Sequence, residues 1–542
     1  MPTLNWIGKD AVLRHHEEVP FHLLEEVPAL SCGEDSGNLI VEGDNLLALK
    51  ALLPHYAGQV KCIYIDPPYN TGNEGWVYND NVNSPEMKQW LGKVVGKEAE
   101  DLSRHDKWLC MMYPRLSLLK KFLRMDGVIF VSIDDNELDS LRMLMSEIFF
   151  PQHNVATLIW KRRTTPDSRN LNGVSIDHEY ILCFQRTSGF RVRGQAKDLG
   201  KYSNPDNDPR GPWMSDNLTG LANAVERPNL HYELIHPLTG TAFPPHSSRG
   251  WIFGRERMAA LITDDRILWP KKETGRPRLK RFITDMRSSE TGLSSVLDAP
   301  GNVEATKELA NIMGPKVFAF PKPSRLISQL IEQCTEDGDL ILDSFAGSGT
   351  TGHAVLTLNG TKSDGRRFIL VEMDSIVARD ITAERIRRVV NGYRKQNGEE
   401  VAGLGGGFRY CTLAQPLFDE RGHISASVKF TDLAKHVYFV ETGTPLPVTP
   451  SSRAKSQDSR LRGVFNSEAG HDEQERSKSR KTPLLGVHQG RAVYLLYNGI
   501  LGDRSTGGGN TLTTPLLAEL PAHDGPQVIY GARCLIGADK LR

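Results

Sequence analysis

LILDSFAGSGTT, residues 340–351, is an apolar run that ends at an acidic residue and continues through two loop glycines toward a helix-forming segment. A strand, a glycine-rich turn and a helix in this order are typical of doubly wound α/β sheets. The glycines let the backbone approach a ligand, and the N-terminus of the following helix favours an anion. The next apolar run, 367–372, ends at Glu372, whose carboxylate can accept hydrogen bonds from both hydroxyls of a ribose. Because a glycine turn alone could be purely structural, this acidic strand end is what favours a site for a nucleoside with a short tail.

A second informative stretch is IYIDPPYNTG at 63–72, an apolar strand followed by Asp66-Pro67-Pro68-Tyr69. The two prolines fix φ and have no N–H, so the carbonyls of Asp66 and Pro67 can face a cleft beside the carboxylate. That carboxylate and a main-chain carbonyl can accept both N–H bonds of an exocyclic amino group while Tyr69 stacks on a planar base. The alternative is a stiff turn in which Asp66 is only a cap. The buried strand before it and the tyrosine after it favour base binding.

Strands and helices also alternate around both motifs. Residues 39–66 indicate a strand, a capped helix and a second strand that ends at Asp66. A later helix is expected to end at Gly127 through a positive φ, and 128–133 is expected to be a buried strand. The alternation stops near residue 160 and resumes after residue 300, so one sheet with both faces covered is interrupted by an insertion.

The interrupting segment is basic, although the chain of 542 residues has a formal net charge of zero. Residues 160–290 contain 22 Lys and Arg against 15 Asp and Glu. Clusters such as Lys161-Arg162-Arg163 and Lys271-Lys272 could neutralise phosphates, whereas a charge run is also compatible with a merely solvated face. The position between the two motif-bearing halves favours contact with a nucleic acid.

The rest of the chain excludes several classes of protein. No apolar run is long enough to span a bilayer, and the first residues lack the pattern of a signal peptide, so we expect a cytoplasmic protein. The seven cysteines form no CxxC and the 16 histidines form no ligand spacing, so we expect reduced thiols and no metal site. Residues 395–407 are expected to be a linker, and 451–481 a mobile segment because it has few apolar residues.

With these motifs identified, the chain resembles the S-adenosylmethionine-dependent DNA amino-methyltransferases, and most closely the modification subunits of type III restriction–modification systems. The DPPY at 66–69 matches the catalytic motif and DSFAGSGTT matches the cofactor motif of that family. Four further segments match in order over about residues 1–395: GDNLLAL (43–49), GVIFVSIDDNE (127–137), NVEATKEL (302–309) and FPKPSRLI (320–327). Resemblance beyond residue 409 is much fainter.

The resemblance implies a Rossmann-like, doubly wound methyltransferase domain, circularly permuted so that the catalytic motif precedes the cofactor motif, which is the β order. It also implies a target recognition domain inserted between the motifs and a small C-terminal domain, α+β or mostly β. The expected boundaries are 1–160 for the catalytic half, 161–300 for the recognition insert, 301–395 for the cofactor-binding half and 409–542 for the C-terminal domain.

The resemblance also assigns roles to individual residues. The catalytic candidates, which would hold a flipped base, are Asp66, Pro67, Pro68 and Tyr69. The candidates for binding S-adenosylmethionine are Asp343, Phe345, Ala346, Gly347, Gly349, Thr350, Glu372, Lys322 and Asp44, with Glu372 on the ribose and Lys322 near the methionine end. Ser344 departs from the apolar residue that many relatives carry at this position.

The expected substrate is N6 of adenine in duplex DNA, because the family's N4-cytosine enzymes more commonly carry SPPY. The lack of a Pro-Cys pair excludes the thiolate route of cytosine carbon-5 methylation. Alternatives are an N4-cytosine enzyme, an RNA adenine methyltransferase, and a mainly DNA-binding specificity subunit for a helicase–nuclease partner. The resemblance further implies a homodimer and a separate restriction subunit.

Overall fold

The computed structural model describes residues 3–33, 37–71, 89, 92–93, 103–168, 173–246, 248–272, 274–286, 288–360, 365–419, 421–425, 427–447, 483–498 and 503–537. The segment 451–481, for which mobility was expected, lies outside these residues. The chain forms two compact units: unit 1 comprises Met1–Val192 and Ser294–Arg542, and unit 2 comprises Arg193–Leu293. Unit 2 falls within the expected recognition insert 161–300, whose boundaries remain a prediction.

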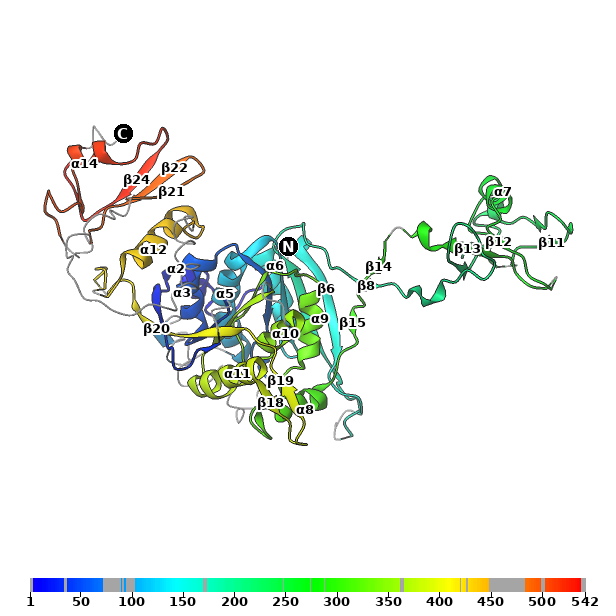
Figure 1. Cartoon of the computed structure of the whole chain (residues 1–542), viewed down its shortest axis with the longest axis horizontal. Helices are drawn as coiled ribbons and strands as arrows, with labels where there is room; N and C mark the ends of the chain where they lie inside the picture. The colour runs from blue at the N-terminus through cyan, green and yellow to red at the C-terminus, as the bar shows by residue number, and fades with distance from the viewer. Residues whose placement is uncertain are drawn as a thin grey trace, which may run out of the picture. The chain divides into compact units, whose positions relative to one another are not determined.

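The centre of unit 1 is an 11-stranded mixed sheet (Figure 1). Six adjacent strands pair in parallel; in sheet order they are β20 (Gly407–Pro416), β3 (Leu39–Glu42), β17 (Arg367–Glu372), β16 (Leu340–Asp343), β4 (Val60–Ile65) and β5 (Leu123–Ile133). Beyond β5, the sheet continues with β7 (His178–Gln185) and β6 (Asn154–Lys161), each antiparallel to its predecessor, and ends at β15 (Val296–Leu297). At the other side, β1 (His22–Glu26) and β2 (Cys32–Gly33) pair antiparallel to β20. The α/β class with a mostly parallel sheet is confirmed.

Helices cover both faces of this sheet because its central strands are apolar on both sides. Ile63 and Ile65 of β4 belong to a core shared with one group of helices, whereas the intervening Tyr64 points the other way. The first group is α3 (Asn45–Tyr56), α5 (Arg104–Phe122) and α6 (Leu138–Phe149). The second is α8 (Asn302–Met313), α9 (Ser324–Glu332), α10 (Thr350–Asn359), the π-helical stretch η6 (Val377–Ala383) and α11 (Glu384–Asn391).

The sheet order explains how residues far apart in sequence form one site. Strands β4 and β16 are direct parallel neighbours, with Ile63 opposite Leu342. Asp66 follows the end of β4 and Asp343 ends β16, so both carboxylates lie at the same edge of the sheet. Strand β17 runs on the other side of β16 and brings Glu372 to this edge too.

Two local expectations were wrong. Helix α5 ends at Phe122, five residues before Gly127, and Gly127 lies inside β5 without a positive φ. A Cβ there would lie 2.9 Å from the carbonyl oxygen of Arg124, so the glycine serves close backbone packing. The expected linker 395–407 instead includes β19 (Glu400–Ala402), which pairs with β18 (Gly392–Arg394), and leads directly into β20 of the main sheet.

The C-terminal part of unit 1 adds a helix and small sheets. Its core joins α12 (Phe430–Thr442) to β21 (Leu484–His488) and β22 (Arg491–Leu495), with β24 (Gln527–Tyr530) parallel to β22. A second small core includes α14 (Thr514–Glu519), near the pair β23 (Thr511–Leu512) and β25 (Arg533–Cys534). At the N-terminus, the short helices α1 (Lys9–Val12) and α2 (His15–Glu18) pack against α5.

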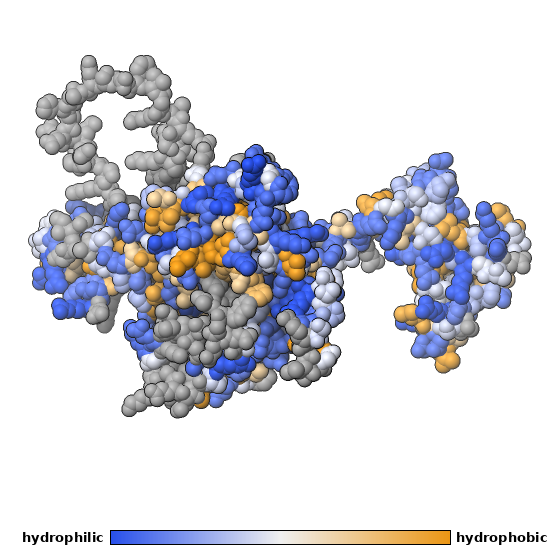
Figure 2. All heavy atoms as spheres, turned by 90° about the horizontal axis from the view of Figure 1, so that it is seen from below, coloured by the Kyte–Doolittle hydropathy of each residue, from blue (hydrophilic) through white to orange (hydrophobic). Residues whose placement is uncertain are grey.

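Unit 2 has its own core around Trp251, which is 1% exposed. It contains a three-stranded sheet of β12 (Ile267–Leu268), β13 (Arg278–Phe282) and β9 (Trp213–Asp216), the helix α7 (Arg255–Thr263), and the pairs β10 (Leu234–Ile235) with β11 (Ala242–Phe243) and β8 (Gln195–Ala196) with β14 (Glu290–Thr291). Its surface in Figure 2 is largely hydrophilic with separate apolar patches, and Leu221, Val225 and Leu238 are each at least 82% exposed. Within the described parts of both units, no helix is long and apolar enough to cross a membrane.

Candidate active site

One cleft in unit 1 is lined by residues of both sequence motifs. Asp66 and Tyr64 contribute from the end of β4, and Lys322 from the segment before α9. The opposite wall is the loop between β16 and α10, including Phe345 and Gly347. The structure therefore brings the DPPY motif and the glycine loop together, as the sequence predicted for a two-substrate site.

Two groups donate to the Asp66 carboxylate: the ammonium of Lys322 and the hydroxyl of Tyr69. Lys322 Nζ lies 2.9 Å from Oδ1 and 2.8 Å from Oδ2, and the Tyr69 hydroxyl donates to Oδ1 at 2.8 Å. A second carboxylate, Glu179, accepts from the same tyrosine hydroxyl at 3.0 Å and lies 3.4 Å from Lys322 Nζ. The Asp66 carboxylate thus already accepts from an ammonium and a hydroxyl in the cleft, although the sequence did not predict the lysine beside it.

The environment of these groups determines their charge. Burial alone would lower the pKa of Lys322, but the carboxylates of Asp66 and Glu179 raise it above its ordinary value. Burial and the charge of Asp66 raise the pKa of Tyr69 well above its ordinary value, so its hydroxyl keeps its proton. The Lys322 ammonium also lies 4.9 Å from the centroid of the Tyr69 ring and 5.8 Å from that of Trp160.

The turn after Asp66 is fixed from both sides. The carbonyl of Pro68 accepts from the indole N–H of Trp108 at 2.6 Å. Asn70 has a positive φ of 57°, and its side chain donates to Glu137 at 2.5 Å and to the carbonyl of Arg104 at 3.2 Å. Because an asparagine tolerates this left-handed backbone, the turn can end directly after Tyr69.

The loop between β16 and α10 is organised by Asp343. Its carboxylate accepts from the backbone N–H of Phe345 at 2.9 Å and from the Thr351 hydroxyl at 2.5 Å. Gly347 and Gly349 have φ of 51° and 76°, a left-handed conformation that glycine adopts without strain. Ala346 anchors the loop through a backbone bond to the carbonyl of Val371 at 3.0 Å.

Glu372, at the end of the neighbouring strand β17, holds the loop between β16 and α10 through a hydrogen bond. Its carboxylate accepts from the N–H of Gly347 at 2.8 Å and from the N–H of Asp374 at 2.9 Å. Burial raises the pKa of Glu372 to about 8 and that of Asp343 to about 7. Two buried acids at the mouth of a glycine loop fit the hydroxyl and amino donors of a nucleoside.

Arg385 of α11 supports the same loop and was not singled out from the sequence. Its guanidinium is fully buried and donates to the Ser348 carbonyl and hydroxyl, at 3.3 and 3.0 Å, and to the Thr350 hydroxyl at 2.9 Å. Glu308 of α8 lies 3.5 Å away and supplies a counter-charge. The Thr350 hydroxyl in turn donates to the carbonyl of Lys322 at 3.2 Å, linking the loop to the lysine segment.

The side chain of Asp44 has a mainly local, structural role. Its side chain caps α3 by accepting from the N–H groups of Leu46 and Leu47 at 2.9 and 3.1 Å. Arg115 lies 3.3 Å from its other oxygen. This geometry explains an acidic residue at the start of α3, and its role toward a cofactor remains a prediction.

Ser344 is buried, at 1% exposed, and its hydroxyl has no hydrogen-bond partner among the described residues. Ser344→Ala should therefore raise the free energy of unfolding by about 1 kcal/mol, because it removes an unsatisfied buried hydroxyl. Chemical denaturation of both proteins measures this difference, with Ser328→Ala as a control that removes a partly buried, bonded hydroxyl. Destabilisation of Ser344→Ala by a similar amount would show that the hydroxyl is in fact satisfied.

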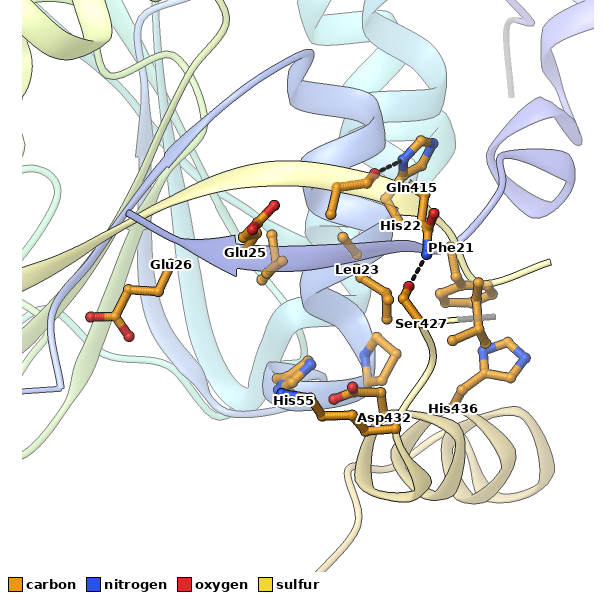
Figure 3. Close-up of a pocket in the computed structure, with 16 residues that line it drawn as sticks. Phe21, His22, Leu23, Glu25, Glu26, His55, Gln415, Ser427, Asp432 and His436 are labelled. Atoms are coloured by element: carbon orange, nitrogen blue, oxygen red, sulfur yellow. Dashed lines mark hydrogen bonds between the residues drawn. The ribbon is translucent and has the colours of Figure 1, made fainter. Parts of the chain in front are cut away.

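A second cavity, of about 590 Å³, contains none of the predicted site residues (Figure 3). It lies between β1, β20, α3 and α12, with His55 and Asp432 opposite the strand and His436 beside Phe21. Its polar groups come from several elements and do not converge on one point in Figure 3. Among the described residues, no group of three or more His, Cys, Asp or Glu side chains could hold a metal ion.

The donor set at the Gly347–Gly349 loop fits S-adenosylmethionine. A Cβ at Gly349 would come within 3.2 Å of the Thr382 carbonyl oxygen, so the loop needs glycine there to keep its present course. Glu372 can receive a ribose, and the N-terminus of α10 favours a carboxylate.

The DNA methylase family model, N6_N4_Mtase, matches residues 60–383, more than half of the chain. The chain is 32% identical to the type III restriction–modification enzyme StyLTI Mod subunit of Salmonella typhimurium, over 77% of this chain and 67% of that protein. It is 31% identical to the EcoP15I Mod subunit of Escherichia coli, over 69% of this chain and 64% of that protein. The chain thus spans about two thirds of these relatives' length.

Among solved structures, the PvuII DNA methyltransferase, which is cytosine-N4-specific, aligns with a TM-score of 0.35 at 14% identity, over 68% of this chain and 96% of that one. The resemblance inferred from DPPY and the glycine loop is confirmed by the family match and by the sequence identity to the Mod subunits. This chain belongs to the N6_N4_Mtase family of S-adenosylmethionine-dependent DNA methylases.

Proposed function

We propose that this chain transfers a methyl group from S-adenosylmethionine to N6 of adenine in duplex DNA, as the modification and specificity subunit of a type III restriction–modification system. The single observation that carries the proposal is the cleft in which the Asp66 carboxylate faces the loop between β16 and α10. The similarity to Mod subunits over most of this chain supports the same function.

The base must leave the duplex to reach Asp66, which costs a few kcal/mol of unstacking that stacking on Tyr69 partly returns. Asp66 and the carbonyl of Pro67 accept the two N–H bonds of the amino group. This withdraws the nitrogen lone pair from the ring and directs it toward the loop at Gly347. No covalent bond to the enzyme is needed, and no cysteine lines the cleft among its described residues.

The cofactor, when bound, supplies an electrophilic methyl group on a sulfonium. Gly347 and Gly349 would let the backbone approach the cofactor closely. Glu372 would accept the ribose hydroxyls of the cofactor, and Phe345 would cover the base ring of the cofactor. Lys322 contacts the loop through its carbonyl and Asp66 through its ammonium, so it holds the carboxylate in place until the base arrives. The side chains thereby orient two substrates and exclude water between them.

Adenine is favoured over cytosine because the motif is DPPY. Unit 2, with 16 Lys and Arg against 12 Asp and Glu, lies in the interval expected to read the DNA sequence.

We further propose that the chain forms a homodimer, binds a helicase–nuclease subunit and acts in the cytoplasm. A monomeric mass by light scattering at micromolar concentration would contradict the homodimer.

A substrate panel tests this function. The purified chain is incubated with labelled S-adenosylmethionine and, separately, unmethylated plasmid DNA, structured RNA and protein extract. We expect label only in the DNA, and sequencing of the labelled sites should show one short motif. Label in RNA would favour the RNA methyltransferase alternative, and cofactor binding without any transfer would favour a specificity subunit that only binds DNA.

The raised pKa values of Glu372 and Asp343 predict how stability depends on pH. The unfolded chain titrates these carboxyls near pH 4, so their contribution to folding is full below that pH. It is lost as the pH rises through about 7 for Asp343 and about 8 for Glu372, since the folded state resists ionisation. Melting temperatures of the cofactor-free chain should therefore fall between about pH 4 and pH 8, and less steeply in Glu372→Gln.

The stabilisation of the chain by bound cofactor should depend on pH in the opposite direction. Ribose hydroxyls donate to the ionised Glu372, so the increase in melting temperature caused by S-adenosylmethionine should grow across the same pH range. A pH-independent increase would show that Glu372 does not hold the ribose.

A further inference from the structure

Glu179 is the second residue of β7 and belongs to neither of the two motifs that define the site. Its side chain is buried, with 6% exposed, and both oxygens are engaged. Oε1 accepts from Arg162 at 3.0 Å, while Oε2 accepts from the Tyr69 hydroxyl at 3.0 Å and lies 3.4 Å from Lys322 Nζ. Glu179 is thus a second buried carboxylate that shares the partners of Asp66.

Three of the roughly four acceptor positions of the Asp66 carboxylate are already used. Lys322 lies within hydrogen-bond distance of both carboxylate oxygens, and the Tyr69 hydroxyl donates to one of them. An incoming amino group needs at least one of these oxygens. The ammonium already pairs with the charge of Asp66 and competes with the amino group for its oxygens, so the base binds this carboxylate fully only when the ammonium gives up part of its contact.

The ammonium cannot simply move into water. Lys322 is 10% exposed and lies over the rings of Tyr69 and Trp160. A buried ammonium without a carboxylate is strongly unfavourable, so it needs a second partner nearby. Glu179 is that partner, 3.4 Å from Nζ in the present arrangement.

We propose that Glu179 is a positioning residue that receives the Lys322 ammonium when the amino group of the target base replaces it on Asp66. The inference rests on the proposed function, because it assumes that Asp66 binds the base. The charges are balanced throughout: Lys322 and Arg162 face Asp66 and Glu179 before the exchange and after it. Tyr69, whose hydroxyl lies between the two carboxylates, keeps its place in both states.

Glu179→Gln tests this role because the amide keeps the shape of the side chain and loses its charge. Lys322 then has only Asp66 as a carboxylate partner and is held on it. We expect kcat/KM for DNA to fall about 30-fold at pH 7. The Kd for S-adenosylmethionine should stay within about twofold, since Glu179 does not line the loop wall.

The pH profile separates this role from a structural one. The titratable groups that face Lys322 are Asp66, Glu179 and Tyr69, and Arg162 faces Glu179. Without the Glu179 charge the pKa of Lys322 falls, so high pH should remove its proton and release Asp66. The deficit of Glu179→Gln should then shrink at least about fivefold between pH 7 and pH 10.

A double variant provides the second measurement. Lys322→Met removes the ammonium that Glu179 is proposed to receive, so Glu179→Gln should cost less than about threefold in that background. The matched control is Glu147→Gln. Glu147 lies on α6 and forms an ion pair with Lys9 of α1 at 2.9 Å, and the substitution removes this carboxylate. It should leave kcat/KM unchanged.

Three results of the methylation assays would contradict the inference. These are wild-type kcat/KM in Glu179→Gln, a deficit that does not change with pH, and equal costs of Glu179→Gln with and without Lys322. Loss of cofactor binding in Glu179→Gln would also overturn it, because the effect would then be structural. A wild-type chain that binds cofactor and methylates no DNA would instead refute the proposed function, and with it this inference.

Discussion

Asp66→Ala should lower kcat for methyl transfer by about three orders of magnitude, the cost of removing a charged acceptor that acts on the reacting group. The carboxylate is the group that would withdraw the nitrogen lone pair from the ring of the base. Among the described residues, the other carboxylate that lines this cleft is Asp343, which is already bonded within the loop between β16 and α10. The measurement is single-turnover transfer of labelled methyl to DNA at saturating cofactor.

The variant should stay folded and bind cofactor. Lys322 loses Asp66 but keeps Glu179, so no buried ammonium is left without a carboxylate. Asp66→Asn should be equally inactive, since its amide places N–H donors where acceptors are needed. The control is Asp139→Ala on the exposed side of α6, which should have wild-type kcat. Activity of Asp66→Ala within tenfold of wild type would contradict the catalytic assignment.

Gly349→Val should raise the Kd for S-adenosylmethionine at least about 30-fold, or about 2 kcal/mol. Gly349 has a φ of 76°, which a β-branched residue adopts only with strain, and its Cβ would lie 3.2 Å from the Thr382 carbonyl oxygen. The loop must shift away from η6, and the N–H of Gly347 then leaves Glu372. Calorimetric titration with the cofactor measures the change.

Gly398→Val is the matched control for this variant. Gly398 has a φ of 87° in the turn between β18 and β19, with no atom within 4 Å of a Cβ built on it. Both variants pay the strain of the left-handed backbone and should lower the melting temperature, but only Gly349→Val should lose cofactor affinity. Equal Kd values for the two variants would show that the loop is not the cofactor site.

The sequence predicts much of the sheet because the relevant signals are local. Apolar runs ending at Asp66, Asp343 and Glu372 define strands β4, β16 and β17. Strands β16 and β17 end at the expected residues, and β4 ends at Ile65, one residue before Asp66. The same runs place the acids at the carboxyl edge of a parallel sheet, so a cleft between the motifs follows from topology. The strand order itself is a long-range property that no local pattern predicts.

The sequence does not predict the features of the site that depend on contacts between residues far apart in the chain. Glu179 reaches Asp66 only because β7 returns antiparallel beside β5, which no local pattern indicates. One signal was available, an acidic residue at the start of the apolar run EYILCF. The glycines at 127 and in 395–407 predict breaks for a related reason, because no local pattern shows that a glycine serves close packing or lies beside a strand pair.

The central claim is that Asp66 presents an adenine amino group to the cofactor loop. The most direct test is mass identification of the methylated nucleoside after the wild-type chain has modified unmethylated plasmid DNA. We predict N6-methyladenine as the product, and none of it with Asp66→Ala. N4-methylcytosine as the sole product would contradict the base assignment, and N6-methyladenine formed undiminished by Asp66→Ala would contradict the account of the site.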